Sequence, residues 1–189
     1  MTRADRMSPA DTQPLDGPPP AVRVPAGGAD RKELRGVLGL FATGITVVTA
    51  GTDVPHGMTA NSFTSVSMHP PLVLVCVQRD AAMHDMILDG GAFAVSVLSA
   101  EQEQVAKHFA NRARPRGERE FDVVECVPGR HTGVPIMAKT LAWLECRLAA
   151  VYDGGDHSIF LGSVLDMGRG AGRNALLFFG GDFHGFEAL

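Results

Sequence analysis

The chain contains the stretch 56-HGMTANSFTSVSMHPPLVLVCV-77, whose two halves differ in character. The first half consists of small residues with hydroxyl or amide groups, which is typical of a loop. A double proline ends it, and the apolar run 72–77 predicts a strand buried on both faces. Small side chains let a flat ligand approach the backbone, and Thr, Asn and Ser offer hydrogen bonds to a heteroaromatic edge. The stretch therefore indicates a binding loop beside a buried strand.

Other apolar and β-branched runs predict the remaining strands of a mainly β domain. They lie at 45–49, 93–98, 141–152, 158–165 and 176–179. The residues Asp-Gly-Gly-Asp after the third run predict a turn that joins two strands. This close spacing favours antiparallel pairing over repeated βαβ units. We therefore expect a β-barrel, closed or partly split, with peripheral helices.

Three short helices are predicted around this barrel. Apolar residues recur at helical spacing in 34–41, and the segment 81–88 has the same period. Ser99 and Gln102 form the pattern of a capping box, which opens a third helix. The segment 111–134 is rich in arginine, glycine and proline, so we expect a solvated loop there.

The first 30 residues differ in composition from the rest of the chain. They hold six of its twelve prolines and few large apolar residues. Such a segment buries too little apolar surface to offset the entropy lost on ordering. We therefore expect a disordered, Pro-rich N-terminal arm over 1–30 and a single domain over 31–189.

Composition excludes several classes of partner. The formal net charge is -4, which lacks the basic footprint of a nucleic-acid-binding protein. No apolar run approaches the roughly 18 residues that a membrane span needs, and no secretory signal follows the first arginines. The three cysteines are widely spaced, so neither a disulfide framework nor a zinc motif is indicated. We expect a cytoplasmic protein that binds neither nucleic acid nor membranes.

Conventional catalytic motifs are missing from the sequence. It contains no nucleophile elbow, no Walker loop and no dinucleotide-binding glycine motif between a strand and a helix. The seven histidines do not pair at helical ligand spacing, so no metal site is predicted. These absences indicate a site in which a bound cofactor supplies the reactive atoms.

Several motifs occur in an order and spacing that resemble the flavin reductase-like family. The resemblance extends from about Arg31 to Phe186 and implies an FMN-binding split β-barrel that forms homodimers, with flavin near the subunit interface. The motifs that carry it are Phe41–Thr49, Gly57–Phe63, Ser65–Ser67, Pro70–Val73, Phe93–Leu98, Gln104–Ala110, Gly155–His157, Gly162–Val164 and Leu176–Phe179.

The resemblance also implies an activity. Members of this family are NAD(P)H-dependent flavin reductases that transfer a hydride from nicotinamide C4 to flavin N5. The flavin is FMN or FAD, the co-substrate is NADH or NADPH, and the reduced flavin reaches a separate flavin-dependent monooxygenase by diffusion. Two alternatives share the same barrel: a flavin-binding or haem-binding module without turnover, and a pyridoxamine phosphate oxidase-like enzyme. The latter should need several basic phosphate ligands, and the flavin stretch is poor in Lys and Arg.

Positions carried over from the family give the expected flavin contacts. The isoalloxazine ring is expected to contact Thr59, Ala60, Asn61 and Ser62. The ribityl chain is expected to contact Ser65, Val66 and Ser67. The strand that ends beside the flavin is expected to contribute Cys76, Val77 and Gln78.

The expected phosphate site departs from the family pattern. Family members often carry Ser and Thr where this chain has Ala81, Ala82 and Met83. Backbone amides of Ala82 and Met83 at the start of a helix can still bind phosphate, and Arg79 can add charge. Asp80 would oppose the anion unless it caps the helix.

The nicotinamide side of the site is expected at His157, the sharpest single candidate. The matching family position lies beside the nicotinamide, where an imidazole can bond the carboxamide or neutralise charge on the reduced ring. Thr43 and Gly44 are expected to form another wall of this pocket, and Phe183 to stack nearby. The arginines from Arg112 to Arg119 could bind a nucleotide phosphate, but a solvated charge run is the expected interpretation.

Overall fold

The computed structural model describes residues 30–187, so the predicted N-terminal arm lies outside the described residues except for Asp30. The first helix, α1 (Arg31–Leu38), crosses a division of the chain between Arg35 and Gly36. From Gly36 onwards the chain forms one unit, and the following description concerns that unit.

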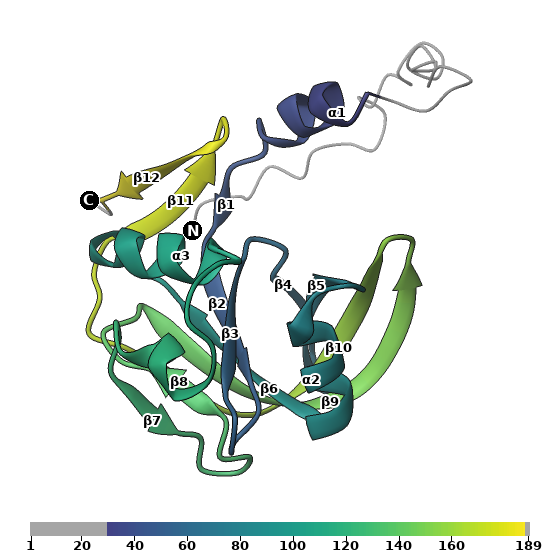
Figure 1. Ribbon diagram of the computed structural model, residues 1–189, viewed down its shortest axis with the longest axis vertical. Helices are drawn as coiled ribbons and strands as arrows, with labels where there is room; N and C mark the ends of the chain where they lie inside the picture. The colour runs from purple at the N-terminus through teal and green to yellow at the C-terminus, as the bar shows by residue number, and fades with distance from the viewer. Residues whose placement is uncertain (1–29, 188–189) are drawn as a thin grey trace, which may run out of the picture. The chain divides into compact units, whose positions relative to one another are not determined.

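An antiparallel sheet of seven strands is the centre of this unit. Its strands are ordered β3-β2-β6-β9-β10-β5-β4 (Figure 1), and every pair within it is antiparallel, as predicted. The strands are β2 (Thr46–Ala50), β3 (His56–Ala60), β4 (Thr64–Met68), β5 (Pro71–Gln78), β6 (Ala92–Val97), β9 (Ala142–Gly154) and β10 (His157–Arg169).

The two edges of this sheet are consecutive in the sequence. β3 and β4 are joined only by residues 61–63, so the sheet curls until its edges meet without pairing. This is a split barrel, and the mainly β fold is confirmed. The prediction of a loop between 56 and 69 was wrong, because most of this segment forms β3 and β4. The small residues of these edge strands lack the apolar alternation that marks a strand buried on one face.

Two smaller sheets flank the barrel. The strands β1 (Thr43–Gly44), β11 (Ala175–Phe179) and β12 (Asp182–Phe186) form one of them. β7 (Cys126–Pro128) pairs with β8 (Pro135–Met137) in the other. The short strands β7, β8 and β12 were not predicted from the sequence.

Within this unit, short helices lie on the barrel. They are α2 (Ala82–Gly90), the 3-10 turn η1 (Ala100–Gln102), α3 (Glu103–Ala110) and the 3-10 turn η2 (Gly117–Phe121). The predicted capping box is confirmed, since the backbone amide of Ser99 donates to Oε1 of Gln102 at 3.1 Å. The side-chain nitrogen Nε2 of Gln102 donates to the carbonyl of Ala138.

The main core fills the space between the curled sheet and α2. Phe93, Phe160 and Met83 are fully buried there. Alternate residues of β5 contribute to this core, while those between them are half-buried or exposed, so the prediction of a strand buried on both faces was wrong. Antiparallel sheets commonly bury one face only. Among residues 30–187, no helix is long and apolar enough to cross a membrane.

Candidate functional site

A cavity of about 430 Å³ opens where β3, the start of α2, the end of α3 and the arginine-rich loop meet. It brings together residues that lie far apart in the sequence, including most of the predicted flavin contacts. The predicted residues that line it are Thr59, Ala60, Asn61, Ser62, Cys76, Gln78, Ala82 and His157.

A larger hollow of about 760 Å³ lies beside η1 and contains none of the predicted site residues. Its wall includes Ser99 and Gln102, whose polar groups are already used in the capping box. We therefore place the functional site at the smaller cavity, where polar and charged groups from five segments converge.

Two hydroxyl groups hold the backbone in place at the end of the cavity that residues 59–62 form, which is called the ring end below. The hydroxyl of Ser62 accepts a hydrogen bond from the amide of Cys76 and donates one to its carbonyl, both at 3.0 Å. The hydroxyl of Thr59 donates to the carbonyl of Ala106 in α3 at 2.6 Å. These bonds tie residues 59–62 to β5 on one side and to α3 on the other.

The thiol of Cys76 also lines the cavity. Burial raises the pKa of this thiol above its ordinary value of 9.0. The group therefore stays protonated at neutral pH and is a poor nucleophile. Its place in the cavity wall is that of a small, neutral side chain.

A buried ion pair anchors the arginine-rich loop to β3. The Glu120 side chain is completely buried, and Arg114 lies beside it with 7% of its side chain exposed. Nη2 of Arg114 lies 2.6 Å from Oε1 of Glu120, and Nδ1 of His56 lies 2.9 Å from Oε2. The amide of Gly57 donates to Oε1 at 3.1 Å, and Arg114 also donates to the carbonyl of Gly57. The prediction of a solvated loop was therefore wrong for Arg114.

Gly57 has a steric role in this arrangement. A Cβ atom at this position would lie 2.5 Å from the ring of Phe109, so only glycine allows the ring to pack on the β3 backbone. The Arg114 guanidinium lies over the Phe109 ring, with its central carbon 5.6 Å from the ring centroid. Phe109 lines the cavity, so the ion pair and the ring form one rigid wall.

The opposite end of the cavity carries groups that suit an anion. Arg112 and Arg116 are exposed and line the cavity, and Nη2 of Arg112 donates to Oε1 of Gln78 at 2.8 Å. Ala81 is the N-cap of α2 and forms no side-chain cap, which leaves the first amides of that helix available. Asp80 also lines this end and opposes an anion there. Phosphate binding by the arginines from Arg112 to Arg119 was considered from the sequence, but a solvated charge run was preferred, because such a run carries no local sign of what it faces.

Arg79 was predicted near the phosphate but is engaged elsewhere. Its Nε donates to the carbonyl of Gly155 at 3.0 Å, and its Nη2 lies 3.1 Å from Oδ1 of Asp153. The hydrogen bond from the Gly155 amide and the nearby Arg79 charge lower the pKa of Asp153. Arg79 thus holds the β9–β10 turn, and the arginines in the cavity wall come from the loop after α3.

His157 begins β10 beside Gln78, its partner on β5. Its Nδ1 lies 2.7 Å from Oδ1 of Asp156, and 41% of the side chain is exposed. The carboxylate orients the ring and leaves Nε2 free to face a ligand. The fold therefore brings His157 into the same cavity as residues 59–62, as expected.

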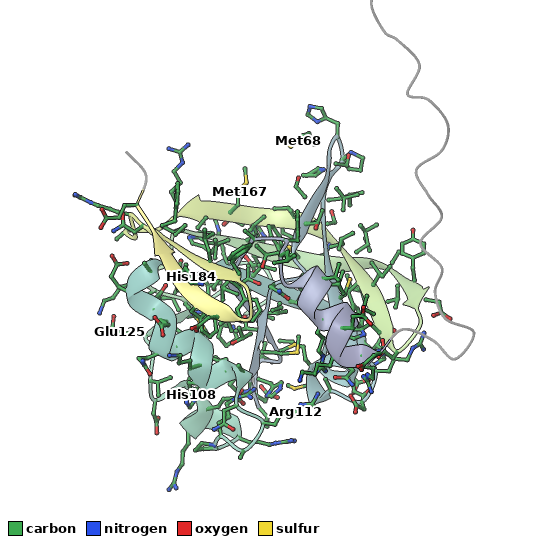
Figure 2. All side chains as sticks on the ribbon, turned by 90° about the horizontal axis from the view of Figure 1, so that it is seen from above. Met68, His108, Arg112, Glu125, Met167 and His184 are labelled. Carbon is green, nitrogen blue, oxygen red and sulfur yellow. The ribbon has the colours of Figure 1, made fainter. Side chains whose placement is uncertain are left out.

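Other predicted residues lie outside this cavity. Ser65, Val66 and Ser67 lie on β4, whose outer end carries Met68 on the side of the unit away from Arg112 (Figure 2). The side chains of Val77 and Met83 are fully buried in the main core, so these residues can offer a ligand only backbone groups.

Three more predicted residues gather in the small sheet of β1, β11 and β12. Thr43 pairs with Phe178, and Phe178 pairs with Phe183 in the next strand. The rings of Phe178 and Phe183 pack edge to face with centroids 5.5 Å apart. The hydroxyl of Thr43 is buried and has no hydrogen-bond partner within residues 30–187. Thr43, Gly44 and Phe183 thus form a group of their own, and none of them lines the cavity.

Comparison with a protein-family model gives one match. The model is described as flavin reductase like domain, and it matches residues 38–187, nearly all of the described chain. A curated relative from Streptomyces globisporus, named NADH-dependent FAD reductase, is 50% identical over 173 residues. The match covers 92% of this chain and 93% of the relative.

Two solved structures share the fold and half of the sequence. One is BorF, the flavin reductase component of a bacterial two-component tryptophan halogenase, with a TM-score of 0.81 and 52% identity; the match covers 85% of this chain and all of BorF. The other is the NADH:FAD oxidoreductase SgcE6 of Streptomyces globisporus, in complex with NAD and FAD fragments. Its TM-score is 0.77 at 51% identity, over 82% of this chain and 92% of that one.

Proposed function

The chain belongs to the family of flavin reductase-like domains, and we propose that it is an NADH-dependent flavin reductase that acts best on FAD. The observation that carries this proposal is the cavity itself. It joins a segment of small residues, 59–62, to His157 and to an arginine-bearing end suited to phosphate. A relative that is half identical is named for NADH and FAD.

The ring end of the cavity fits a flat heteroaromatic group. The hydroxyls of Thr59 and Ser62 are bonded to Ala106 and to Cys76, so they hold the segment rigid. We assign the contacts to the ring edge to backbone groups of Ala60 and Asn61 and to the exposed Asn61 side chain. A rigid set of small groups can stack a flavin without reorganisation when it binds.

The other end of the cavity fits the pyrophosphate of FAD. We propose that the first amides of α2, at Ala82 and Met83, bind phosphate oxygens. Arg112 and Arg116 add positive charge from across the cavity and offset Asp80. FAD, with two phosphates, would use more of this charge than FMN.

His157 is proposed to contact the nicotinamide. The flavin, when bound, supplies the redox chemistry by taking a hydride at N5 from C4 of NADH. The chain's part is to stack the two rings at reacting distance and to favour charge on the reduced ring. The His157 imidazole, which Asp156 orients and which is partly exposed, can form a hydrogen bond with the carboxamide through Nε2. No side chain need act as acid or base.

Thr43, Gly44 and Phe183 are proposed to bind the far side of the nicotinamide nucleotide. The buried Thr43 hydroxyl lacks a partner in the described chain, and a ligand amide would satisfy it. Lys107 lies 5.9 Å from the Phe183 ring centroid, which places a positive charge beside that ring.

We further propose that the protein is a homodimer. In a single chain Ser65, Val66 and Ser67 lie on an edge strand, where Val66 is 47% exposed and Met68 is 76% exposed. Exposed apolar groups on an unpaired edge are typical of an interface. If this edge meets a second copy, the predicted ribityl contacts from β4 come near the flavin of the dimer.

The reduced flavin is proposed to diffuse to a separate flavin-dependent monooxygenase. BorF is the reductase component of a two-component system, which supports a partner of that kind for this chain. The free thiols of Cys76, Cys126 and Cys146 are consistent with the reducing cytoplasm that we propose as its location.

One assay tests this function directly. Purified full-length protein is mixed with FAD, FMN or riboflavin, and the oxidation of NADH or NADPH is followed by the absorbance of the reduced nicotinamide. We expect turnover with NADH and fastest reduction of FAD. Flavin binding without oxidation of either nucleotide would instead identify a binding module, and absence of flavin binding would refute the site.

A further inference from the structure

Glu145 is a completely buried carboxylate on β9, and it does not line the flavin cavity. Three donors converge on its Oε1: the amides of His131 and Thr132 at 2.9 and 2.6 Å, and the Thr132 hydroxyl at 2.7 Å. Its other oxygen, Oε2, has no hydrogen-bond partner within residues 30–187. A buried polar atom without a partner calls for a ligand, because desolvation without a bond is costly.

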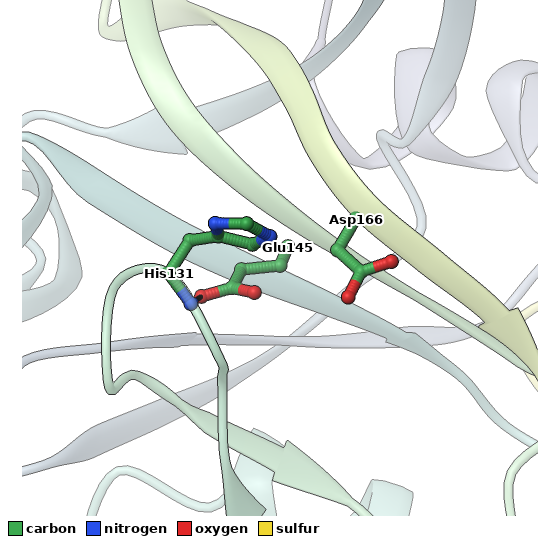
Figure 3. A group of neighbouring side chains, drawn as sticks. All are labelled: His131, Glu145 and Asp166. Atoms are coloured by element: carbon green, nitrogen blue, oxygen red, sulfur yellow. Dashed lines mark hydrogen bonds between the residues drawn. The ribbon is translucent and has the colours of Figure 1, made fainter.

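Two further ligating groups lie beside that carboxylate. One ligand atom from each of His131, Glu145 and Asp166 lies within 4.8 Å of the other two. Figure 3 shows the three side chains converging from the β7–β8 loop, from β9 and from β10. Asp166 is the direct cross-strand partner of Glu145, and its Oδ1 already accepts a hydrogen bond from the Met167 amide. Its Oδ2 remains for a ligand.

The loop that carries His131 is shaped around Glu145. A Cβ atom on Gly129 would lie 2.5 Å from Oε1 of Glu145, so glycine allows the loop to approach the carboxylate. The loop is closed by a hydrogen bond from the amide of Gly133 to the carbonyl of Gly129 at 2.9 Å. Glu145 is therefore held in one orientation through Oε1, which leaves Oε2 without a hydrogen-bond partner in the described chain.

The charges of this group require a counter-ion. Two carboxylates face each other across the β9–β10 pair, and no Lys or Arg in the described part of the chain forms an ion pair with either of them. Like charges directly opposite in a sheet destabilise it. A cation between Oε2 of Glu145 and Oδ2 of Asp166 would remove both the repulsion and the orphaned oxygen.

We propose that His131, Glu145 and Asp166 form a binding site for a divalent metal ion of the zinc class. One imidazole nitrogen and two carboxylate oxygens suit zinc, which binds both kinds of atom at about 2.0–2.2 Å. Magnesium and calcium prefer sites made of oxygen only. A water molecule completes four-coordination. The exposed His131 side chain closes on the ion, while Glu145 is already in place.

The ion would link three segments that are distant in the sequence. It would join the β7–β8 loop to the β9–β10 hairpin, so its role is to stabilise this side of the barrel. None of the three residues lines the flavin cavity, so flavin reduction should not depend on it.

The test uses untagged full-length protein that has been treated with a chelator and dialysed. Zinc is titrated by calorimetry, with magnesium as a comparison, and the melting temperature is measured with and without zinc. Asp166→Asn and His131→Ala remove one ligand each without touching the buried carboxylate. Asp89→Asn, exposed on α2, makes the same chemical change away from the group and serves as the matched control.

We expect one zinc per chain, a rise in melting temperature with zinc, and at least about a tenfold weaker affinity in each ligand variant. Asp89→Asn should bind as the unchanged protein does, and NADH oxidation should be the same in all four proteins. Absence of zinc binding by the unchanged protein would overturn the proposal. A zinc affinity in His131→Ala and Asp166→Asn equal to that of the unchanged protein would overturn it as well.

Discussion

The hydroxyl of Ser62 bonds both backbone groups of Cys76, accepting from its amide and donating to its carbonyl at 3.0 Å each. Ser62 lies in the short connection between β3 and β4, the two unpaired edges of the main sheet, and Cys76 lies on β5. One side chain thus links the connection to the sheet where the barrel is split. The same segment forms one end of the cavity that we propose binds flavin, so closure of the barrel and the proposed flavin site share one bond pair.

Replacing Ser62 by Ala should therefore affect stability and binding together. Two half-buried backbone groups would lose their partner, which costs about 1–3 kcal/mol of the free energy of unfolding. Urea unfolding measures this loss, and fluorescence titration should show weaker FAD binding. Thr64→Ala, on exposed β4, is the control and should change stability by less than about 0.5 kcal/mol. Equal stability of both variants would mean that this hydroxyl does not hold the segment.

Arg114 should be a structural residue despite its position in an arginine-rich loop. Arg114→Ala leaves the fully buried Glu120 without its main counter-charge, and breaking a buried pair in this way costs about 3–5 kcal/mol. Thermal and urea unfolding measure the effect. Arg116→Ala, a few residues away and exposed, should leave stability nearly unchanged. A small loss in Arg114→Ala would contradict the anchoring role.

Arg112 and Arg116 should instead contribute to binding of the flavin phosphates. Hydrogen bonds to charged groups contribute about 1.5–3 kcal/mol, so Arg112→Ala or Arg116→Ala should weaken FAD binding by about tenfold or more. Riboflavin lacks phosphate and supplies the matched ligand control, because its affinity should not change. If both flavins lost affinity equally, these arginines would act on the fold rather than on phosphate.

His157→Ala should separate nicotinamide binding from flavin binding. Removing one preorganised donor at a developing charge costs about 100-fold in rate in well-studied enzymes, and we expect kcat/KM for NADH to fall by about tenfold or more. The Kd for FAD should change little, because the ring and phosphate ends are untouched. Steady-state kinetics and flavin titration give the two values. His131→Ala, outside the cavity, is the control, and unchanged turnover in His157→Ala would remove His157 from the mechanism.

The half-buried thiol of Cys126 and the buried thiol of Cys146 should make the protein less stable in alkali. Burial raises the pKa of Cys126 to about 11 and that of Cys146 to about 12, from an ordinary value of 9.0. Above about pH 9 the unfolded chain loses these protons while the folded chain keeps them, so ionisation favours unfolding. The stabilising contribution is complete below pH 9 and is lost as the pH rises toward 11–12.

Urea midpoints at several pH values check this dependence. The fall in midpoint between neutral pH and about pH 10.5 should be smaller in Cys126→Ser, which lacks one of the titrating thiols. The same fall in both proteins would show that other groups control alkaline unfolding.

Local patterns predicted those parts of the fold that depend on neighbouring residues. The capping box of Ser99 and Gln102 needs only four residues, and the apolar strand 93–98 is almost the same as the observed β6. The turn before His157 was also predicted, because glycine at Gly155 permits its positive φ of 77°. Each of these signals is complete within a few residues of the chain.

The sequence failed where the deciding contact is long-range. The segment 56–69 was expected to be a loop, because edge strands of small polar residues lack a strand pattern. Arg79 was expected near phosphate, but the charge of Asp153, which lies across the sheet on β9, draws it to the turn.

The sequence by itself determined the family, the apolar strands and the small residues at 59–62 that line the cavity. Only the tertiary structure decided which arginine is buried in an ion pair and which ones line the cavity. His56 and Glu120 are separated by 64 positions and meet in a hydrogen bond beside the buried ion pair of Glu120 with Arg114. Arg112 and Arg116 have the same charge and nearly the same place in the chain, yet they stay at the cavity surface. Burial of a charge depends on the partner that folding brings to it, and that partner leaves no mark on the neighbouring sequence.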